Sequence, residues 1–90
     1  MIIVSYDISD DKLRTRFAKF LSKYGYRLQY SVFRIENSER LLNLIVQNIH
    51  DEFSKKFTEA DSVLIYPVDE EKMLKYGYAS HEDDDLIIIV

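Results

Sequence analysis

Residues 2–7 read Ile-Ile-Val-Ser-Tyr-Asp, an apolar run that ends on a carboxylate. Such a run is typical of a buried strand. An acidic side chain at the end of a buried strand is usually a helix cap, a metal ligand or a catalytic group. The spacing alone leaves Asp7 open as a helix-capping carboxylate, a loop carboxylate or a metal ligand, and the function of the chain depends on which of them holds.

The segment after Asp7 predicts an amphipathic helix with a basic flank. Ser9 or Asp10 is a suitable N-cap, and Gly25 is expected to end the helix after about Tyr24. The apolar face of this helix comprises Leu13, Phe17, Phe20, Leu21 and Tyr24. Basic side chains follow at helical spacing beside that face, at Lys12, Arg16, Lys19 and Lys23, and Arg14 lies on the other flank.

The rest of the chain alternates strands with a second helix. Residues 26–35 are rich in β-forming residues, and the alternation slips near Val32, which predicts a bulge or two short strands. Asn37 and Ser38 are expected to cap a helix over about 39–57. The apolar face of this helix comprises Leu41, Leu42, Ile45, Val46, Ile49, Phe53 and Phe57. A further strand is expected at 61–68, ending near Pro67.

This order predicts an α+β fold of the ferredoxin-like βαββαβ type, an antiparallel sheet with two helices on one face. The other sheet face would then be bare although it carries apolar side chains, which calls for a partner, most simply a second copy. We assign residues 1–79 to this domain. Residues 80–90 are expected to form an acidic turn and a C-terminal strand comprising Leu86, Ile87, Ile88, Ile89 and Val90.

Composition restricts the location and the partners of the chain. The 90 residues contain no Cys, which excludes a disulfide framework and fits a cytoplasmic protein. We expect no signal peptide and no membrane span, because the longest apolar run is five residues, 86–90. The net charge is −4, but residues 1–40 hold eight Lys/Arg against five Asp/Glu, whereas residues 41–90 hold four against eleven. A basic face on an acidic chain can still bind phosphates.

Seven residues are the candidates for chemistry: Tyr6, Asp7, Arg14, Arg16, Arg27, Ser31 and Phe33. Magnesium accepts one or two carboxylates and keeps several waters, so one Asp7 per chain suffices if two copies meet at the ion. The arginines suit phosphate contacts, although most arginines on helix surfaces are simply solvated. Ser31 has no His nearby in sequence, which argues against a nucleophilic role.

Three segments together resemble a known family. They are Val4-Ser5-Tyr6-Asp7-Ile8 with the Arg-bearing helix behind it, Gly25-Tyr26-Arg27-Leu28-Gln29-Tyr30-Ser31-Val32-Phe33, and Asp61-Ser62-Val63-Leu64-Ile65-Tyr66-Pro67. In order and spacing they are similar to the small CRISPR-associated protein that partners the spacer integrase. The resemblance covers about residues 1–79, and its most specific parts are the Tyr-Asp and Gln-Tyr-Ser-Val-Phe segments.

The resemblance implies a ferredoxin-like homodimer joined through the sheet faces. It also implies a Mg²⁺ ion between the two copies of Asp7, which would be both metal ligand and catalytic residue. The residues lining the site would be Tyr6, Arg14, Arg16, Arg27, Ser31 and Phe33. Such a dimer would bridge integrase dimers and hold protospacer DNA during spacer acquisition. The resemblance leaves two alternatives, a non-catalytic scaffold and a Mg²⁺-dependent endonuclease that cuts single-stranded RNA or duplex DNA.

The sequence leaves two other functions open, a ribonuclease toxin with a similar ferredoxin-like scaffold and a non-catalytic RNA-binding module. The RNA-binding module is disfavoured because its glycine-aromatic sheet motif is absent. For residues 86–90 we expect a docking strand that pairs with an open sheet edge, either of the second copy or of the integrase subunit.

Overall fold

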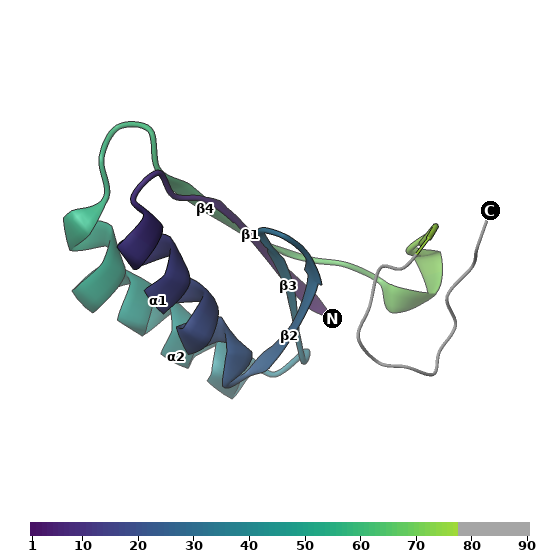
Figure 1. Ribbon diagram of the computed structural model, residues 1–90. Helices are drawn as coiled ribbons and strands as arrows, with labels where there is room; N and C mark the ends of the chain where they lie inside the picture. The colour runs from purple at the N-terminus through teal and green to yellow at the C-terminus, as the bar shows by residue number, and fades with distance from the viewer. Residues whose placement is uncertain (78–90) are drawn as a thin grey trace.

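Four strands form one sheet whose neighbouring pairs are all antiparallel. The computed structural model describes residues 1–77 (Figure 1). The strands are β1 (Ile2–Asp7), β2 (Gly25–Gln29), β3 (Val32–Ile35) and β4 (Ser62–Pro67), in the order β2-β3-β1-β4. The helices α1 (Asp11–Ser22) and α2 (Glu39–Asn48) lie on the same side of this sheet. The predicted ferredoxin-like α+β fold is therefore confirmed.

The second helical segment is less regular than predicted. The Oγ of Ser38 accepts a hydrogen bond of 3.3 Å from the backbone N–H of Leu41, which confirms Ser38 as the N-cap of α2. After α2 the chain continues as a π-helical turn, η1 (Ile49–Phe53), and a 3₁₀ turn, η2 (Ser54–Lys56). The helical path thus ends near the predicted residue 57, but only its first part is α-helix. A further 3₁₀ turn, η3 (Glu70–Lys72), follows β4.

Gly25 does not end α1, and that prediction was wrong. The helix ends at Ser22, and Gly25 is the first residue of β2, where it pairs with Ile35. A Cβ atom at Gly25 would lie 1.9 Å from the backbone oxygen of Arg34. Glycine is therefore needed because β2 and β3 approach closely at this point, which is a long-range requirement that the local pattern does not contain.

The β-rich segment is a hairpin of two short strands, one of the two predicted outcomes. Its irregularity lies in β2, where the register shifts between Arg27 and Gln29 and leaves Leu28 without a paired residue on β3. A bulge at this position increases the local twist of the hairpin. The slip that the sequence suggested near Val32 belongs instead to the turn at residues 30–31.

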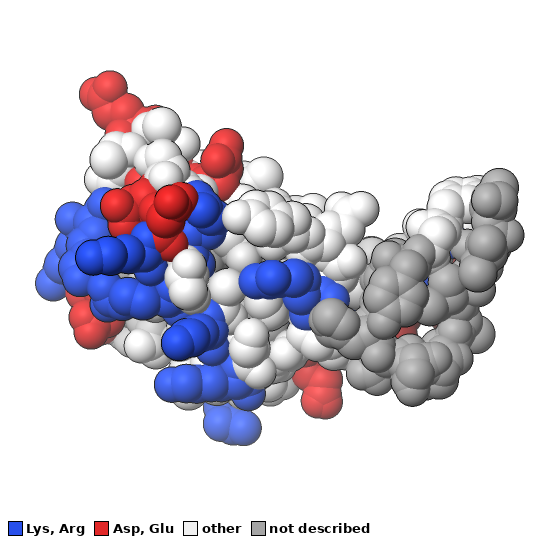
Figure 2. All heavy atoms as spheres, viewed as in Figure 1, with Lys and Arg blue, Asp and Glu red and all other residues white. Residues whose placement is uncertain are grey.

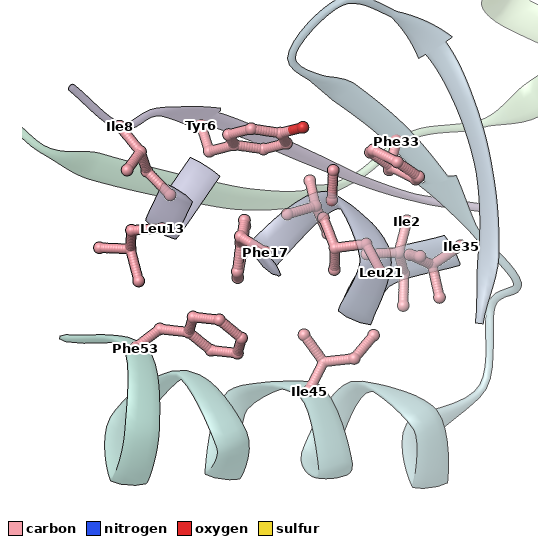
Figure 3. Close-up of a cluster of buried hydrophobic side chains, with 12 residues drawn as sticks. Ile2, Tyr6, Ile8, Leu13, Phe17, Leu21, Phe33, Ile35, Ile45 and Phe53 are labelled. Atoms are coloured by element: carbon pink, nitrogen blue, oxygen red, sulfur yellow. The ribbon is translucent and has the colours of Figure 1, made fainter. Parts of the chain in front are cut away.

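The hydrophobic core lies between the sheet and the two helices (Figure 3). Phe17 of α1 is at its centre, with ring centroids 5.0 Å from Tyr6 and 5.0 Å from Phe53, both in edge-to-face geometry. The buried set comprises Ile2, Val4, Tyr6, Ile8, Leu13, Phe17, Ala18, Leu21, Phe33, Ile35, Ile45 and Phe53. Val46 was predicted to belong to the apolar face of α2, but its side chain is 47% exposed.

The second sheet face is only partly bare, which corrects the expected open face. Leu64 of β4 is 60% exposed there, whereas Ile3 of β1 is only 2% exposed. Ile3 shares a groove of about 410 Å³ with Val68 and Met73, from the segment that follows β4. That segment is attached by reciprocal backbone hydrogen bonds between Met1 and Val68, of 3.0 and 2.9 Å.

An ion pair also holds this segment to the sheet. The guanidinium of Arg34 on β3 lies 2.7 Å from the Glu70 carboxylate of η3, and it stacks 5.4 Å from the ring centroid of Tyr26. Within residues 1–77 no helix is long and apolar enough to cross a bilayer. The predicted domain boundary at residue 79 and the predicted docking strand at 86–90 lie outside the described residues.

Candidate nucleic-acid interface and metal ligand

Asp7 is the last residue of β1, where it pairs with Ser62 of β4. Tyr6 points into the core, so the alternation of strand side chains places Asp7 on the opposite face of the sheet. The carboxylate is exposed, and no residue of 1–77 donates a hydrogen bond to it. An exposed carboxylate that no described residue engages is available to a cation or a ligand.

Helix capping is the role of Asp10, which removes the capping interpretation of Asp7. The Asp10 carboxylate accepts a 2.9 Å hydrogen bond from the backbone N–H of Leu13, and its backbone is extended, as N-cap residues are. Ser9, the other candidate cap, hydrogen-bonds elsewhere. Asp7 therefore does not cap α1, and its role as a metal ligand stays a prediction beside that of a loop carboxylate.

Asp7 alone does not make a metal site within one copy of the chain. In the part of the chain that the structure describes, no three His, Cys, Asp or Glu side chains gather closely enough to hold an ion. A single carboxylate is a suitable oxygen ligand for Mg²⁺, because this ion keeps most of its waters. One carboxylate alone binds the ion only weakly. A second carboxylate from another copy would give a donor set that fits.

Asp61 fixes the loop that follows Asp7, a role that sequence reasoning missed. Its Oδ1 accepts hydrogen bonds of 2.8 and 2.9 Å from the backbone N–H and the Oγ of Ser9, and its Oδ2 accepts one of 2.8 Å from the N–H of Thr58. The backbone donors of Ser9 and Thr58 lower the pKa of Asp61. Asp61 and Ser9 are 52 residues apart, so no local pattern points to this contact.

Asp61→Asn is expected to lower the melting temperature at pH 7, with a difference from the parent that shrinks in acid. The folded-state pKa is depressed, so the carboxylate stabilises the fold above its ordinary pKa of 3.8 and loses that effect as the pH falls through the folded value. Thermal unfolding of both proteins between pH 7 and pH 3 measures this. A melting-temperature difference that stays constant over the range would contradict it.

Arg14 is partly neutralised by its own helix. Its guanidinium donates a 3.0 Å hydrogen bond to the backbone oxygen of Ile8 and forms an ion pair with Asp11. The hydrogen bond to Asp11 is the main reason why the pKa of Arg14 is raised. Arg14 is therefore held in place beside the end of β1.

The outer surface of α1 is basic (Figure 2). The side chains of Lys12, Arg16, Lys19 and Lys23 are exposed, and within residues 1–77 none of them has an ion-pair partner. The two acidic residues at the start of α1 do not offset this charge, because Asp10 caps the helix and Asp11 pairs with Arg14. This surface therefore attracts phosphate groups.

Three of the predicted site residues make contacts within the fold. Phe33 is a core residue, with its ring centroid 6.3 Å from that of Tyr6. The guanidinium carbon of Arg27 lies 5.3 Å from the centre of the Phe33 ring. Ser31 takes part through its backbone, since its carbonyl oxygen accepts a 3.1 Å hydrogen bond from the N–H of Tyr6.

The seven predicted residues do not form a single cluster. Tyr6, Arg14 and Arg27 line one pocket of about 310 Å³ between α1 and the β2–β3 hairpin, whereas the pocket lining does not include Asp7 or Arg16. Sequence reasoning missed two further residues of this pocket, Lys19 and Tyr30. Lys19 was assigned only to the basic flank, and Tyr30 appeared only as part of the segment from Gly25 to Phe33.

Comparison with known families gives one match over most of the chain. The profile of the family described as "CRISPR associated protein Cas2" matches residues 1–76. That region contains every residue of the basic α1 surface, Asp7 and the hairpin.

Individual relatives agree with this match. The chain is 38% identical over 65 residues to the "CRISPR-associated endoribonuclease Cas2 4" of Rhodospirillum rubrum, covering 72% of this chain and 50% of that protein. It is 34% identical to the "CRISPR-associated endoribonuclease Cas2 3" of Synechocystis, covering 76% of this chain and 71% of that protein. The chain thus spans about half the length of the first relative. The crystal structure of a hypothetical protein from Thermus thermophilus superposes with a TM-score of 0.66 at 37% identity, covering 76% and 79% of the two chains.

Proposed function

The chain belongs to the CRISPR-associated Cas2 family, and from this premise we propose that it acts in spacer acquisition, as a dimer that bridges integrase subunits and holds protospacer DNA. The basic surface of α1 is the observation that carries the proposal. Exposed cations at helical spacing match the charge of a phosphate backbone and need no base contact, which suits DNA of any sequence. Family membership favours this role over the ribonuclease toxin and the RNA-binding module.

Dimerisation through the sheet is supported by the uncovered part of the second face. Leu64 and Tyr66 of β4 are exposed there, beside the groove that contains Ile3. Asp7 projects on this same side of the sheet. A two-fold axis across that face would bring two copies of Asp7 together, and the apolar side chains would supply the contact area.

Endonuclease activity is the second part of the proposal, and it rests on Asp7. The curated relatives are named endoribonucleases, and Asp7 is an exposed carboxylate that no described residue engages. Paired Asp7 side chains would hold Mg²⁺, which lowers the pKa of a bound water and stabilises charge on the phosphoryl oxygens. The basic residues of α1 would orient the nucleic acid backbone. The substrate is single-stranded RNA or duplex DNA.

The variant Arg16→Gln/Lys23→Gln is expected to bind duplex DNA more weakly and with a smaller salt dependence. Each lost phosphate contact reduces the slope of log K against log salt by about 0.9, so two contacts reduce it by about 1.8. Fluorescence anisotropy of a labelled duplex between about 50 and 300 mM NaCl, over which the Debye length falls roughly 2.4-fold, measures the slope.

The matched control is Arg40→Gln/Lys72→Gln, which removes the same charge from exposed positions away from α1. We expect its slope to equal that of the parent protein. An unchanged slope in the α1 variant, or an equal loss in the control, would mean that DNA does not lie on α1.

A further inference from the structure

Three cations of α1 line one groove beside the turn η1. They are Arg16, Lys19 and Lys23, and the groove has a volume of about 360 Å³. Among the lining residues that the structure describes, Glu52 alone is acidic. Within residues 1–77 none of the three cations has an ion-pair partner. The groove therefore has an excess of positive charge that an anionic segment can neutralise.

A run of four acidic residues follows the described part of the chain. Residues 82–85, which we call the acidic run, read Glu-Asp-Asp-Asp and lie outside the described residues. Between Lys75 and Val90 the sequence has no Lys or Arg. Adjacent like charges repel one another, and no cation near in sequence offsets them. The counter-charge of the acidic run must therefore come from a distant part of the fold or from the solution.

The described chain ends beside the hairpin of β2 and β3. Residues 73–76 share one groove with residues 28–29, on the sheet face opposite the helices. Arg27 and Tyr30, on either side of residues 28–29, share a pocket with Lys19 on the helix face. Since β2 is an edge strand, only this edge separates the end of the described chain from the basic surface of α1.

The acidic run has enough chain before it to pass around this edge. Eight peptide units join Gly77 to Asp85, and an extended chain covers at most about 3.6 Å per residue, which gives a reach of up to about 29 Å. Packed layers of secondary structure lie only about 10 Å apart. The acidic run can therefore reach Lys19 and Lys23 of its own α1 without a second copy.

We propose that the acidic run binds Arg16, Lys19 and Lys23 of the same chain and competes there with nucleic acid. Each exposed ion pair is weak, but tethering gives the run an effective concentration on the order of millimolar at α1. Duplex DNA carries a longer array of charges and displaces the run. The basic surface then selects ligands of high charge density. The inference rests on the proposed function, because it describes how that same surface is regulated.

The first test is cross-linking of the full chain with a carbodiimide, which condenses a carboxylate with a lysine amine and takes up the water released. Mass spectrometry of protease fragments is expected to show Lys19 and Lys23 joined to the acidic run, and added duplex DNA is expected to suppress these links. Lys55 of η2 is exposed and outside the groove lining, so it reports random encounters. Links no more frequent at Lys19 and Lys23 than at Lys55 would overturn the proposal.

Isotope labelling identifies the chain that supplies the acidic run. Equal amounts of ¹⁵N-labelled and unlabelled protein are mixed before the carbodiimide is added. Linked fragments that carry one isotope throughout are expected, because the contact forms within one chain. Linked fragments that combine the two isotopes would overturn the assignment to the same chain.

The second test removes the charge of the acidic run. The variant Glu82→Gln/Asp83→Asn/Asp84→Asn/Asp85→Asn is expected to bind a labelled duplex roughly three- to tenfold more tightly than the parent at about 50 mM NaCl. Salt screens the contact, so the gain should shrink as the NaCl concentration rises. In the Arg16→Gln/Lys23→Gln background the same four substitutions should gain less than about twofold, because the run has lost two of its three partners.

The control variant Glu36→Gln/Glu39→Gln/Glu59→Gln/Glu71→Gln removes the same charge from exposed positions elsewhere and measures the effect of net charge alone. We expect it to gain less affinity than the acidic-run variant. Equal gains from the two variants, or an equal gain in both backgrounds, would overturn the inference and leave DNA holding on α1 intact. If no variant binds a duplex, the proposed function is wrong, and the cross-links still decide whether the acidic run contacts α1.

Discussion

Asp7→Asn is expected to slow Mg²⁺-dependent cleavage by at least about 100-fold, because the metal contributes several kcal/mol to such reactions and 1.4 kcal/mol is a factor of ten. The substitution keeps the shape of the side chain and removes the charge that would hold the ion. Asp7 is exposed and packs no core volume, so the melting temperature should stay within about 2–4 °C of the parent. Cleavage of labelled single-stranded RNA and of duplex DNA, with Mg²⁺ and with EDTA, measures the effect.

Glu36→Gln is the matched control for the charge. Glu36 is exposed just after β3 and has no hydrogen-bond partner through its side chain within residues 1–77. We expect the Glu36→Gln variant to cleave at the parent rate. Cleavage by Asp7→Asn at the parent rate would exclude Asp7 from the mechanism. If the parent protein itself cleaves neither substrate, the nuclease part of the proposal is wrong and the DNA-holding part is unaffected.

Gly25→Ala is expected to destabilise the fold by about 1–3 kcal/mol, the usual range for overpacking, and so to lower the melting temperature by roughly 4–20 °C. The added Cβ would lie 1.9 Å from the backbone oxygen of Arg34, which is far closer than real contacts allow. A flexible side chain could move away, but here the neighbour is the backbone of β3. The two strands must therefore separate where Gly25 pairs with Ile35. Thermal and urea unfolding measure the loss.

The second glycine of the chain supplies the control. Gly77 has a φ of +72°, and no atom of residues 1–77 lies within 4 Å of the position its Cβ would take. Asn tolerates this backbone conformation better than other residues with a side chain, so Gly77→Asn should cost less than about 1 kcal/mol. If Gly25→Ala were as stable as the parent, the close approach of β2 to β3 would not be a feature of the folded protein.

Much of the fold could be predicted because its signals are local. The apolar run of β1, the 3.6-residue period of α1 and the cap at Ser38 each involve residues within a turn or a strand of one another. These patterns are read from neighbouring residues, and the structure confirms them. The exposed Val46 shows the limit of such local signals. The periodicity of α2 predicts an apolar stripe, but it does not predict how much of that stripe the sheet and α1 bury.

The candidate site was harder to predict, because its parts are far apart in the chain. The sequence indicated Asp7 and a basic helix as the unusual features; the structure confirms the basic helix surface, and the role of Asp7 stays a prediction. It could not decide whether Asp7 or Asp10 caps the helix, because both residues lie close before it and only the backbone conformation distinguishes them. It also placed Tyr6 and Asp7 in one cluster, although adjacent residues on a strand point to opposite faces.

By itself, the sequence determined the elements, their order and the basic surface of α1, because periodicity, capping and charge spacing act between near neighbours. Only the tertiary structure decided which aspartate caps the helix, why residue 25 is glycine, and that Asp61 holds the loop after Asp7. It also decided that Arg27 and Tyr30 close a cationic pocket against α1. These features depend on strand register and on contacts between distant residues, which exist only after the sheet and the helices have packed.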